Sequence, residues 1–322
     1  MARILYVVHR YAPYPGGSEN YVRDMAEETL TRGHEVCVFT GEHQGDLNGV
    51  RVTDLVSVLN EKWDLIVVHG GDVGVQDFVL RNAKNIQSPI LFMLILPSES
   101  QTYLQAIQDC AYIGCSTTDD WNYVIDKNVV RKSKEIRHGI DPKISTGQFG
   151  FREKYNIKTQ YMFLSCGGYW PNKAMNELVE SFNKAGLEDV TLVLTGYDNR
   201  HGIKPEDSKN VRALMIDDRQ DVLSAILEAD LYIMHSFKEG FGLVLLESML
   251  NKTPWASRKI AGAKVLKDFG FTYEHDEDLV QYMKQFVRDG YVLDPKIDNA
   301  YEFVTLNHMI KNTVDDILRL VE

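Results

Sequence analysis

The sequence is poor in cysteine, in long apolar runs and in positive charge, and each shortage excludes a class of protein. Its four cysteines form no Cys-x-x-Cys pair, which argues against a zinc site or a disulfide framework. No apolar run approaches the roughly 20 residues that span a bilayer. The formal net charge of −11 disfavours nucleic acid, a large polyanion, as the main partner.

The same features predict a globular cytoplasmic protein. A reducing compartment suits unpaired thiols, and no signal-peptide pattern precedes the apolar run at residues 4–8. The chain has 322 residues, of which 44% are hydrophobic and 25% are charged, so two domains of ordinary size are expected. The oligomeric state is left open.

Short apolar runs alternate with amphipathic segments through most of the chain. The runs predict strands at residues 4–9, 36–40, 65–69, 90–96 and 111–116, and again at 161–166, 191–194, 211–215 and 231–234. The amphipathic segments predict helices at residues 18–32, 75–85, 98–109, 117–125, 173–185, 220–228 and 242–250. This alternation is typical of βαβ units and predicts an α/β fold with doubly wound parallel sheets, each covered on both faces.

The alternation pauses once, at residues 139–151, where Pro, Gly, Ser and Thr are typical of a linker. We therefore expect one Rossmann-like domain over residues 1–142 and a second over residues 143–302. A terminal helix at about residues 303–322 is expected to pack back on the first domain. Two such halves leave a cleft at the carboxyl ends of their strands, where ligands of open α/β sheets bind.

The segment at residues 235–249 joins a predicted strand, a glycine turn and a predicted helix. It carries Glu239 in the loop, the turn Gly240-Phe241-Gly242, and Glu247 on the helix. Unpaired N–H groups and the helix dipole at such a junction favour an anion. Two carboxylates would repel a phosphate, but they suit the hydroxyl groups of a ribose and a sugar. The segment therefore predicts a nucleotide-sugar site.

Glycine turns follow other predicted strands. Gly16 and Gly17 let the backbone approach a ligand, although a plain βα turn uses glycines equally well. In the second half, Gly168 lies in a turn that ends at Lys173. A lysine at the start of a helix opposes the dipole unless an anion lies there. Gly196, after the strand at residues 191–194, is expected to line the same cleft.

His69 ends the strand at residues 65–69 and is expected to face the cleft, where its ring could hydrogen-bond a sugar hydroxyl; a lone histidine is more often structural. The pairs Asp119-Asp120 and Asp217-Asp218 lack metal-ligand spacing and favour capping or surface roles. We predict no metal, and no cofactor apart from a nucleoside-diphosphate sugar as donor substrate.

With these residues in place, the chain resembles the GT-B glycosyltransferases of family 4, retaining enzymes that use nucleotide-sugars. Glu239 and Glu247 match the E-x7-E motif within E-G-F-G-L-x-x-L-E-[AS]-M, a highly specific segment. Other matches are, in order, Gly16-Gly17 with the N-terminal glycine loop, Gly139-Ile140-Asp141 with G-[VI]-D, Lys173 with the lysine of G-R-x-x-x-x-K, Thr253-Pro254 with G-T-P, and Gly262 with a late glycine loop. The resemblance covers the second domain nearly throughout and the first weakly.

The resemblance implies specific roles. Glu247 would hold the ribose hydroxyls and Glu239 would contact the donor sugar. Lys173 would neutralise the leaving diphosphate, and His69 matches a histidine near the donor sugar. Backbone amides of the glycine turn would hold phosphate or sugar, those around Phe241, Gly242 and Leu243.

The chain also departs from the family pattern. Gly168 stands where the family usually has arginine, so one cation for the diphosphate is missing or comes from elsewhere; Arg10 and Arg258 are the candidates. The late loop reads Gly262-Ala263 rather than a glycine pair, and the acid usually near it is absent. The first domain, which normally binds the acceptor, is short for the family.

The sequence thus favours a metal-independent retaining glycosyltransferase that acts on a hydroxyl acceptor, which could be a glycan, a lipid-linked molecule or a small molecule. Two alternatives stay open. One is a nucleotide-sugar epimerase or a phosphorylase-like enzyme of the same fold. The other is a non-catalytic sugar-nucleotide binding protein, suggested by Gly168 and the missing loop acid.

Overall fold

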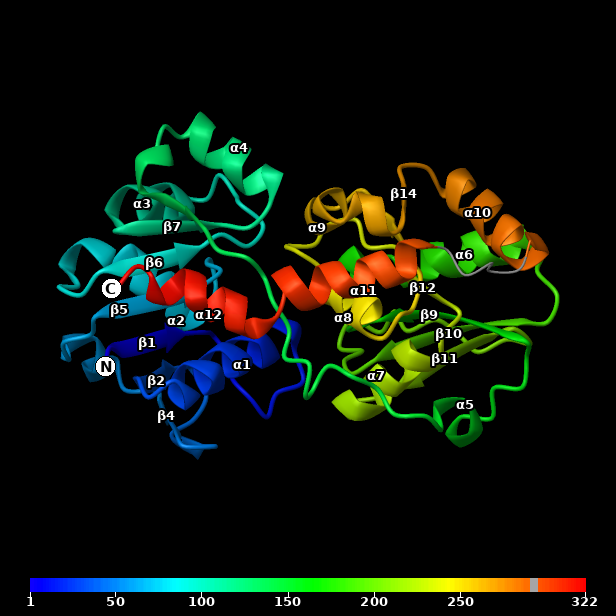
Figure 1. Ribbon diagram of the computed structural model, residues 1–322, viewed down its shortest axis with the longest axis horizontal. Helices are drawn as coiled ribbons and strands as arrows, with labels where there is room; N and C mark the ends of the chain where they lie inside the picture. Colours follow the sequence, from blue (N-terminus) through cyan, green and yellow to red (C-terminus); the bar gives the residue numbers. More distant parts are fainter. Residues whose placement is uncertain (290–294) are drawn as a thin grey trace. The chain divides into compact units, whose positions relative to one another are not determined.

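The computed structural model describes residues 1–289 and 295–322, which form two compact units. The first unit comprises Met1–Asp141 and Asn307–Glu322, and the second comprises Pro142–Leu306. Each unit contains one sheet with helices on both of its faces (Figure 1). The α/β class and the doubly wound sheets predicted from the sequence are confirmed.

The sheet of the first unit has the order β3-β4-β2-β1-β5-β6-β7-β8. Its neighbouring strands are parallel except for the β3–β4 hairpin. The order reverses between β1 and β5, which defines a topological switch point. The strands are β1 (Arg3–Val7), β2 (Glu35–Phe39), β3 (Gly45–Leu47), β4 (Val50–Thr53), β5 (Leu65–His69), β6 (Ile90–Met93), β7 (Tyr112–Cys115) and β8 (Ser133–Glu135).

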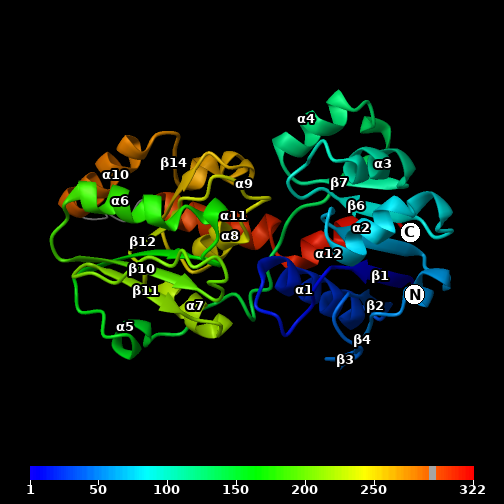
Figure 2. The same cartoon turned by 180° about the vertical axis from the view of Figure 1, so that it is seen from behind.

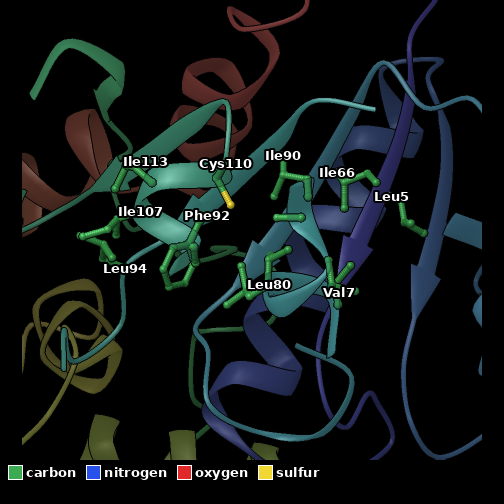
Figure 3. Packing of buried hydrophobic residues seen from close by; sticks show 14 of the residues in the cluster. Leu5, Val7, Ile66, Leu80, Ile90, Phe92, Leu94, Ile107, Cys110 and Ile113 are labelled. Carbon is green, nitrogen blue, oxygen red and sulfur yellow. The ribbon is translucent and has the colours of Figure 1, made fainter. Parts of the chain in front are cut away.

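Successive side chains of a strand point to opposite faces, and both faces of this sheet are covered. Leu5 and Val7 join a buried cluster with α2 and α3, whose labelled members include Leu80 and Ile107 (Figure 3). On the other face the Tyr6 hydroxyl lies 2.7 Å from Thr29 Oγ1 of α1. The helices are α1 (Gly17–Thr31), α2 (Gly74–Arg81), α3 (Gln101–Asp109), α4 (Thr118–Asp126) and α12 (Ile310–Leu318), with 3-10 turns at Val56–Asn60, Ala83–Asn85 and Val130–Lys132.

The sheet of the second unit has the order β11-β10-β9-β12-β13-β14, and all its neighbours are parallel. Counted from β9, this is the order 3-2-1-4-5-6 of dinucleotide-binding sheets. Its switch point lies between β9 and β12. The strands are β9 (Tyr161–Cys166), β10 (Val190–Gly196), β11 (Val211–Met215), β12 (Leu231–Met234), β13 (Trp255–Arg258) and β14 (Phe271–Tyr273).

Helices α6 and α10 share a buried cluster with one face of this sheet, through residues such as Phe182 and Phe286. Helices α7 and α8 lie on the opposite face, as the two opposed views show (Figures 1 and 2). The helices are α5 (Phe151–Lys154), α6 (Met175–Ala185), α7 (Arg219–Glu228), α8 (Leu243–Leu250), α9 (Ala261–Val265), α10 (Asp276–Asp289) and α11 (Pro295–Asn307), with 3-10 turns at Pro171–Lys173 and Lys267–Phe269.

Every strand and helix predicted from the sequence is present, with ends displaced by a few residues. The single terminal helix predicted at about residues 303–322 is wrong, because the segment forms α11 and α12 with a break before Ile310. At the break Ile310 N–H donates to Ile140 O at 2.8 Å. A Cβ on Gly139 would lie 2.3 Å from Met309 O, so this backbone pairing requires glycine. Helix α12 packs on α1.

Within the described residues, no helix combines the length and the apolar content needed to cross a bilayer.

Candidate functional site

The loops that leave β9 and β12 start side by side at the switch point of the second sheet. The two strands pair through Phe163 with Leu231 and through Leu164 with Tyr232. Beyond this pairing, Cys166 Sγ lies 3.8 Å from the Tyr232 hydroxyl. Because ligands of open α/β sheets bind outside the carboxyl ends of the strands at such a reversal, this end of the second sheet is the candidate site.

An ion pair links the two loops. Lys173 Nζ lies 2.5 Å from Glu239 Oε1, and the two side chains are 19% and 16% exposed. Gly167 makes room for the lysine: its φ is +145°, and a Cβ there would lie 3.1 Å from Lys173 Cε. The structure therefore brings together two of the three side chains that the sequence analysis proposed as catalytic.

Lys173 does not begin a helix, and that part of the prediction is wrong. It ends the 3-10 turn Pro171–Lys173, and the next residue, Ala174, is left-handed with φ of +51°. Helix α6 starts only at Met175. Because Lys173 lies outside the first turn of α6, its position does not imply a bound anion. The anion that Lys173 contacts here is the Glu239 carboxylate.

A second ion pair holds the other acid of the predicted motif. Arg219 NH2 lies 2.6 Å from Glu247 Oε1, and the Glu247 side chain is only 6% exposed. A carboxylate this deeply buried stays charged only when it is paired. Sequence analysis missed Arg219; the only available signal was its place just after β11, at the carboxyl end of a strand. The neighbouring Asp218 accepts a hydrogen bond from Gln220 N–H, as the expected helix cap.

Two neutral side chains lie near both ion pairs. Burial, together with the Glu247 charge, raises the pKa of the Cys166 thiol to about 12, while Lys173 and Arg219 oppose the rise. Burial also raises the pKa of the Tyr232 hydroxyl, and the Glu239 and Glu247 carboxylates add to this rise. Residues of both ion pairs thus act on the same two side chains, Cys166 and Tyr232, at the ends of β9 and β12.

The loop after Glu239 contains the residues predicted to hold phosphate or sugar: Gly240, Phe241, Gly242 and Leu243. Gly242 is left-handed, with φ of +83°, and supplies no side-chain cap to α8. A Cβ on Gly262 would lie 1.7 Å from Phe241 O, so the late glycine turn packs directly on this loop. Glycine is needed at both positions to fit this backbone, which brings the start of α8 beside Glu239.

A buried polar network that sequence analysis missed supports the same loop. His235 Nδ1 lies 2.7 Å from the Tyr273 hydroxyl, and its Nε2 lies 2.9 Å from Arg258 NH2. The same Arg258 nitrogen donates to Asp276 Oδ1 at 2.6 Å. Burial, with the nearby Arg258 charge, lowers the pKa of His235 to about 3. Arg258, a candidate for the missing diphosphate cation, is thus engaged by Asp276.

Two other glycines proposed to bind the donor serve packing in this structure. A Cβ on Gly196 would lie 2.4 Å from the Tyr169 ring and 2.8 Å from Gly167 O. A Cβ on Gly168 would lie 2.7 Å from the Trp170 ring. Both glycines therefore let aromatic rings pack against the ends of β9 and β10.

The predicted residues of the first unit lie at its own switch point. Gly16 is the N-cap of α1, which starts at Gly17. The Glu19 carboxylate folds back over this helix start, so that a Cβ on Gly16 would lie 1.9 Å from Glu19 Oε2. Glu19 also pairs with Arg10 Nε at 3.2 Å. A carboxylate of the chain itself therefore lies where an anion would approach α1, and Arg10 is engaged by it.

His69 is only 5% exposed. Its ring centroid lies 5.1 Å from that of Tyr21 and 6.4 Å from that of His138. Burial lowers the pKa of His69 to about 4, so the ring is neutral near pH 7. The structure thus places His69 in a histidine–tyrosine cluster inside the first unit rather than on an open surface.

No group of three or more His, Cys, Asp or Glu side chains suited to a metal ion occurs in residues 1–289 and 295–322.

Comparison with known proteins supports the assignment of this site. Residues 160–289 match the family described as glycosyl transferases, group 1. The match lies within the second unit and contains both ion pairs and the glycine loop. Within the second unit, these residues are therefore similar to that family. No curated protein sequence matches the chain.

Solved structures match the whole chain. HepE from Anabaena, solved in complex with UDP and glucose, is 18% identical with a TM-score of 0.79, and 99% of each chain is covered. Sucrose-phosphate synthase from Thermosynechococcus elongatus is 15% identical with a TM-score of 0.79, over 99% of this chain and 98% of that one. WaaG, a glycosyltransferase of lipopolysaccharide biosynthesis, is 16% identical with a TM-score of 0.72, over 97% and 98%. The fold is GT-B.

Proposed function

We propose that this chain is a retaining glycosyltransferase of family 4 that moves a sugar from a nucleoside-diphosphate sugar to a hydroxyl acceptor without a metal ion or other cofactor. The observation that carries the proposal is the pairing of Lys173 with Glu239 and of Arg219 with Glu247 at the switch point of the second sheet. The group 1 family match and the GT-B fold support transfer of a sugar from a nucleotide-sugar.

The donor would lie across this cluster. Glu247 accepts hydrogen bonds from the ribose hydroxyls, and its pairing with Arg219 fixes the carboxylate for that task. Glu239 accepts a hydrogen bond from a hydroxyl of the donor sugar. The diphosphate lies at the start of α8, where the glycine loop brings backbone N–H groups and the positive end of the helix dipole.

Transfer breaks the bond between the anomeric carbon and the diphosphate oxygen, and forms a bond from the same carbon to the acceptor oxygen on the same face of the sugar. The proton of the acceptor hydroxyl passes to the departing diphosphate oxygen. Negative charge grows on the departing diphosphate. Lys173 has three N–H donors, so it can keep one on Glu239 and turn another to a phosphate oxygen. Donors placed in advance where charge develops are often the largest contribution to catalysis.

The first unit would supply the acceptor side and the remaining proposed contacts. His69, neutral at pH 7, is proposed to hydrogen-bond the donor sugar without adding charge, and Gly16 and Gly17 to line the donor. The Glu19 carboxylate covers the helix start at Gly16, and His69 is buried. To make these contacts, the donor must therefore reach groups that other parts of the chain cover. We propose a cytoplasmic location, which agrees with four buried and unpaired cysteines.

A thermal-shift screen of UDP-, GDP- and ADP-sugars on the full chain tests the donor site. A ligand that binds only the folded state raises the melting temperature, and we expect one nucleotide series to do so. Glu247→Gln should abolish the shift, whereas Glu180→Gln, an exposed acid-to-amide change on α6, should preserve it. An equal shift in wild type and Glu247→Gln would contradict the site.

Turnover distinguishes the proposal from its alternatives. We expect a transferred product that keeps the anomeric configuration of the donor, seen by NMR, and that still forms with excess EDTA. Conversion of the nucleotide-sugar with no acceptor, or with inorganic phosphate alone, would identify an epimerase or a phosphorylase-like enzyme. Nucleotide binding with no product from a broad acceptor panel would identify a binding protein.

A further inference from the structure

A pocket of about 500 Å³ adjoins the Lys173–Glu239 pair in the second unit. It is formed by the 3-10 turn after β9, the first turn of α6 and the loop after β12. The two loops meet where Phe237 N–H donates to Asn172 O at 2.9 Å. The volume is within the range of small-molecule sites. The lining includes Asn172 and Ala174, on either side of Lys173 in the chain, and Phe237, two residues before Glu239.

The lining includes three aromatic residues, Tyr169, Trp170 and Phe237. Phe237 is 56% exposed, although it is a large hydrophobic side chain. The Trp170 ring lies edge-on to Tyr197, with a centroid distance of 5.8 Å and an interplanar angle of 81°. Exposed apolar surface gathered in a pocket is typical of binding sites.

Phe237 is held in a fixed position. The Arg258 guanidinium carbon lies 4.8 Å from the centroid of the Phe237 ring, a cation–π contact over one face. Arg258 is itself fixed by Asp276 and by the buried His235. One ring face is thus covered while much of the side chain stays exposed. Because the ring is already held in place, it loses little conformational entropy when it stacks on a ligand.

The polar groups of the pocket are short amides and a carboxylate. Asn176 Nδ2 donates to Ile203 O at 3.0 Å, and both residues line the pocket. Asn172 and Glu177 also line the pocket. Flat apolar surfaces together with amide and carboxylate groups fit one ligand chemistry well: a pyranose, with an apolar C–H face and hydroxyl groups around its edge.

We infer that this pocket is a carbohydrate subsite in which Phe237 and Trp170 stack on a sugar unit of the acceptor. The inference rests on the proposed function for the identity of that sugar as the acceptor, and it names the acceptor class as a glycan or glycoside. The side chains of Asn172, Asn176 and Glu177 hydrogen-bond the sugar hydroxyls, and the acceptor hydroxyl is directed toward the Lys173–Glu239 pair.

Saturation-transfer NMR on the full chain with saturating UDP tests the inference. The probes are methyl glycosides of glucose, galactose, mannose and N-acetylglucosamine, and maltose. We expect at least one to receive saturation through its ring C–H protons. Phe237→Ala and Trp170→Ala should weaken its binding at least tenfold, and Phe237→Tyr should retain it. The matched control is Phe149→Ala, which removes an 85% exposed phenylalanine elsewhere in the same unit.

The outcomes separate this inference from the proposed function. UDP affinity should stay within twofold of wild type in Phe237→Ala, and Glu239→Gln should leave glycoside binding in the pocket unchanged. Binding of UDP but of no probe, or equal probe binding in wild type, Phe237→Ala and Trp170→Ala, overturns the inference alone. A large loss of UDP affinity in Phe237→Ala overturns it by assigning the pocket to the nucleotide. Probe binding that depends on Phe237 supports a sugar site even if no nucleotide binds.

Discussion

The sheets of the two units reverse their strand order in the same way but differ at their switch points. In both sheets the order reverses next to the first strand, between β1 and β5 in one and between β9 and β12 in the other. In the first unit the chain covers its own switch point, with the Glu19 carboxylate over Gly16 and with His69 buried against Tyr21. In the second, partly exposed charged pairs lie at the corresponding place.

The difference teaches that a switch point provides a place for a site but not the site itself. The second unit brings two cations to its switch point, Lys173 and Arg219, where the first brings Arg10. Lys173 and Arg219 are each balanced by a glutamate, so their charges are compensated within the unit. Lys173 is proposed to meet the departing phosphate, whereas Arg219 is proposed to hold Glu247. In the first unit, Arg10 and Glu19 neutralise each other over the helix start that an anion would use.

The largest expected difference between the two units comes from replacing one charged residue at each switch point. Lys173→Ala removes the cation proposed to meet the leaving diphosphate, and we expect transfer to fall by about 100-fold or more, the scale of losing one preorganised donor. Glu19→Gln, at the matching place in the first unit, should change turnover by less than about threefold on the same scale. Single-turnover rates with the donor found by thermal shift measure both.

Two results would contradict this ranking. A loss of turnover in Glu19→Gln as large as that in Lys173→Ala would place the reaction equally on both units. A Lys173→Ala enzyme with wild-type turnover would remove the lysine from the mechanism. Circular dichroism and melting temperature of each variant check that the change acts on the site rather than on folding.

Acid pH should separate the units by stability. Burial lowers the pKa of His69 to about 4 and that of His138 to about 3, from an ordinary 6.5. The unfolded chain therefore takes up these protons first, and stability is lost as the pH falls from 6.5 toward those values. At pH 5 each histidine should cost about 2 kcal/mol. His69 and His138 both belong to the first unit, whereas the second unit has His235, whose pKa is also lowered by burial. At acid pH the first unit should therefore melt before the second.

His69→Phe, which cannot be protonated, should remove about 2 kcal/mol of the acid loss. Calorimetric scans at pH 7.5 and pH 5 measure it, and His201→Phe, a change at an exposed histidine, serves as the control. If the wild type and His69→Phe lose the same stability between the two pH values, the depressed pKa of His69 is disproved.

The fold was predictable because buried parallel strands appear as continuous apolar runs. The segments at residues 65–69 and 161–166 are strands with those bounds. The short strands β3, β4, β8, β13 and β14 were missed, because their three or four residues mix polar with apolar side chains, whereas the equally short β6 and β12 are continuous apolar runs. Glu239 and Glu247 were found as a local motif, but Arg219 was not. It lies 28 residues before Glu247, and only the fold joins the two. The position of Lys173 was misjudged because nothing marks Ala174 as left-handed.

The Arg219–Glu247 pair can be tested by comparing the binding of a nucleoside with that of its diphosphate. If Arg219 acts by holding Glu247 toward the ribose, Arg219→Ala should weaken uridine and UDP by the same factor, about tenfold for the loss of a buried charge-assisted contact. Isothermal titration with both ligands, or with the nucleoside and nucleotide of the base that the screen selects, measures the two factors. A loss for the diphosphate with an unchanged nucleoside would instead place the guanidinium on a phosphate.

The smallest expected effect comes from opening the first unit. Glu19→Ala removes the carboxylate that covers the N-terminus of α1 and leaves its first N–H groups open to an external anion. An anion at such a position contributes about 0.3–1 kcal/mol. Millimolar phosphate should therefore raise the melting temperature of Glu19→Ala by a degree or two more than that of wild type, on the order of that energy. Glu28→Ala, which removes a carboxylate far from the start of the same helix, is the control. If phosphate stabilises Glu19→Ala no more than wild type, the Glu19 carboxylate does not explain the difference between the two switch points. The geometry of the loop after β1 must then account for it.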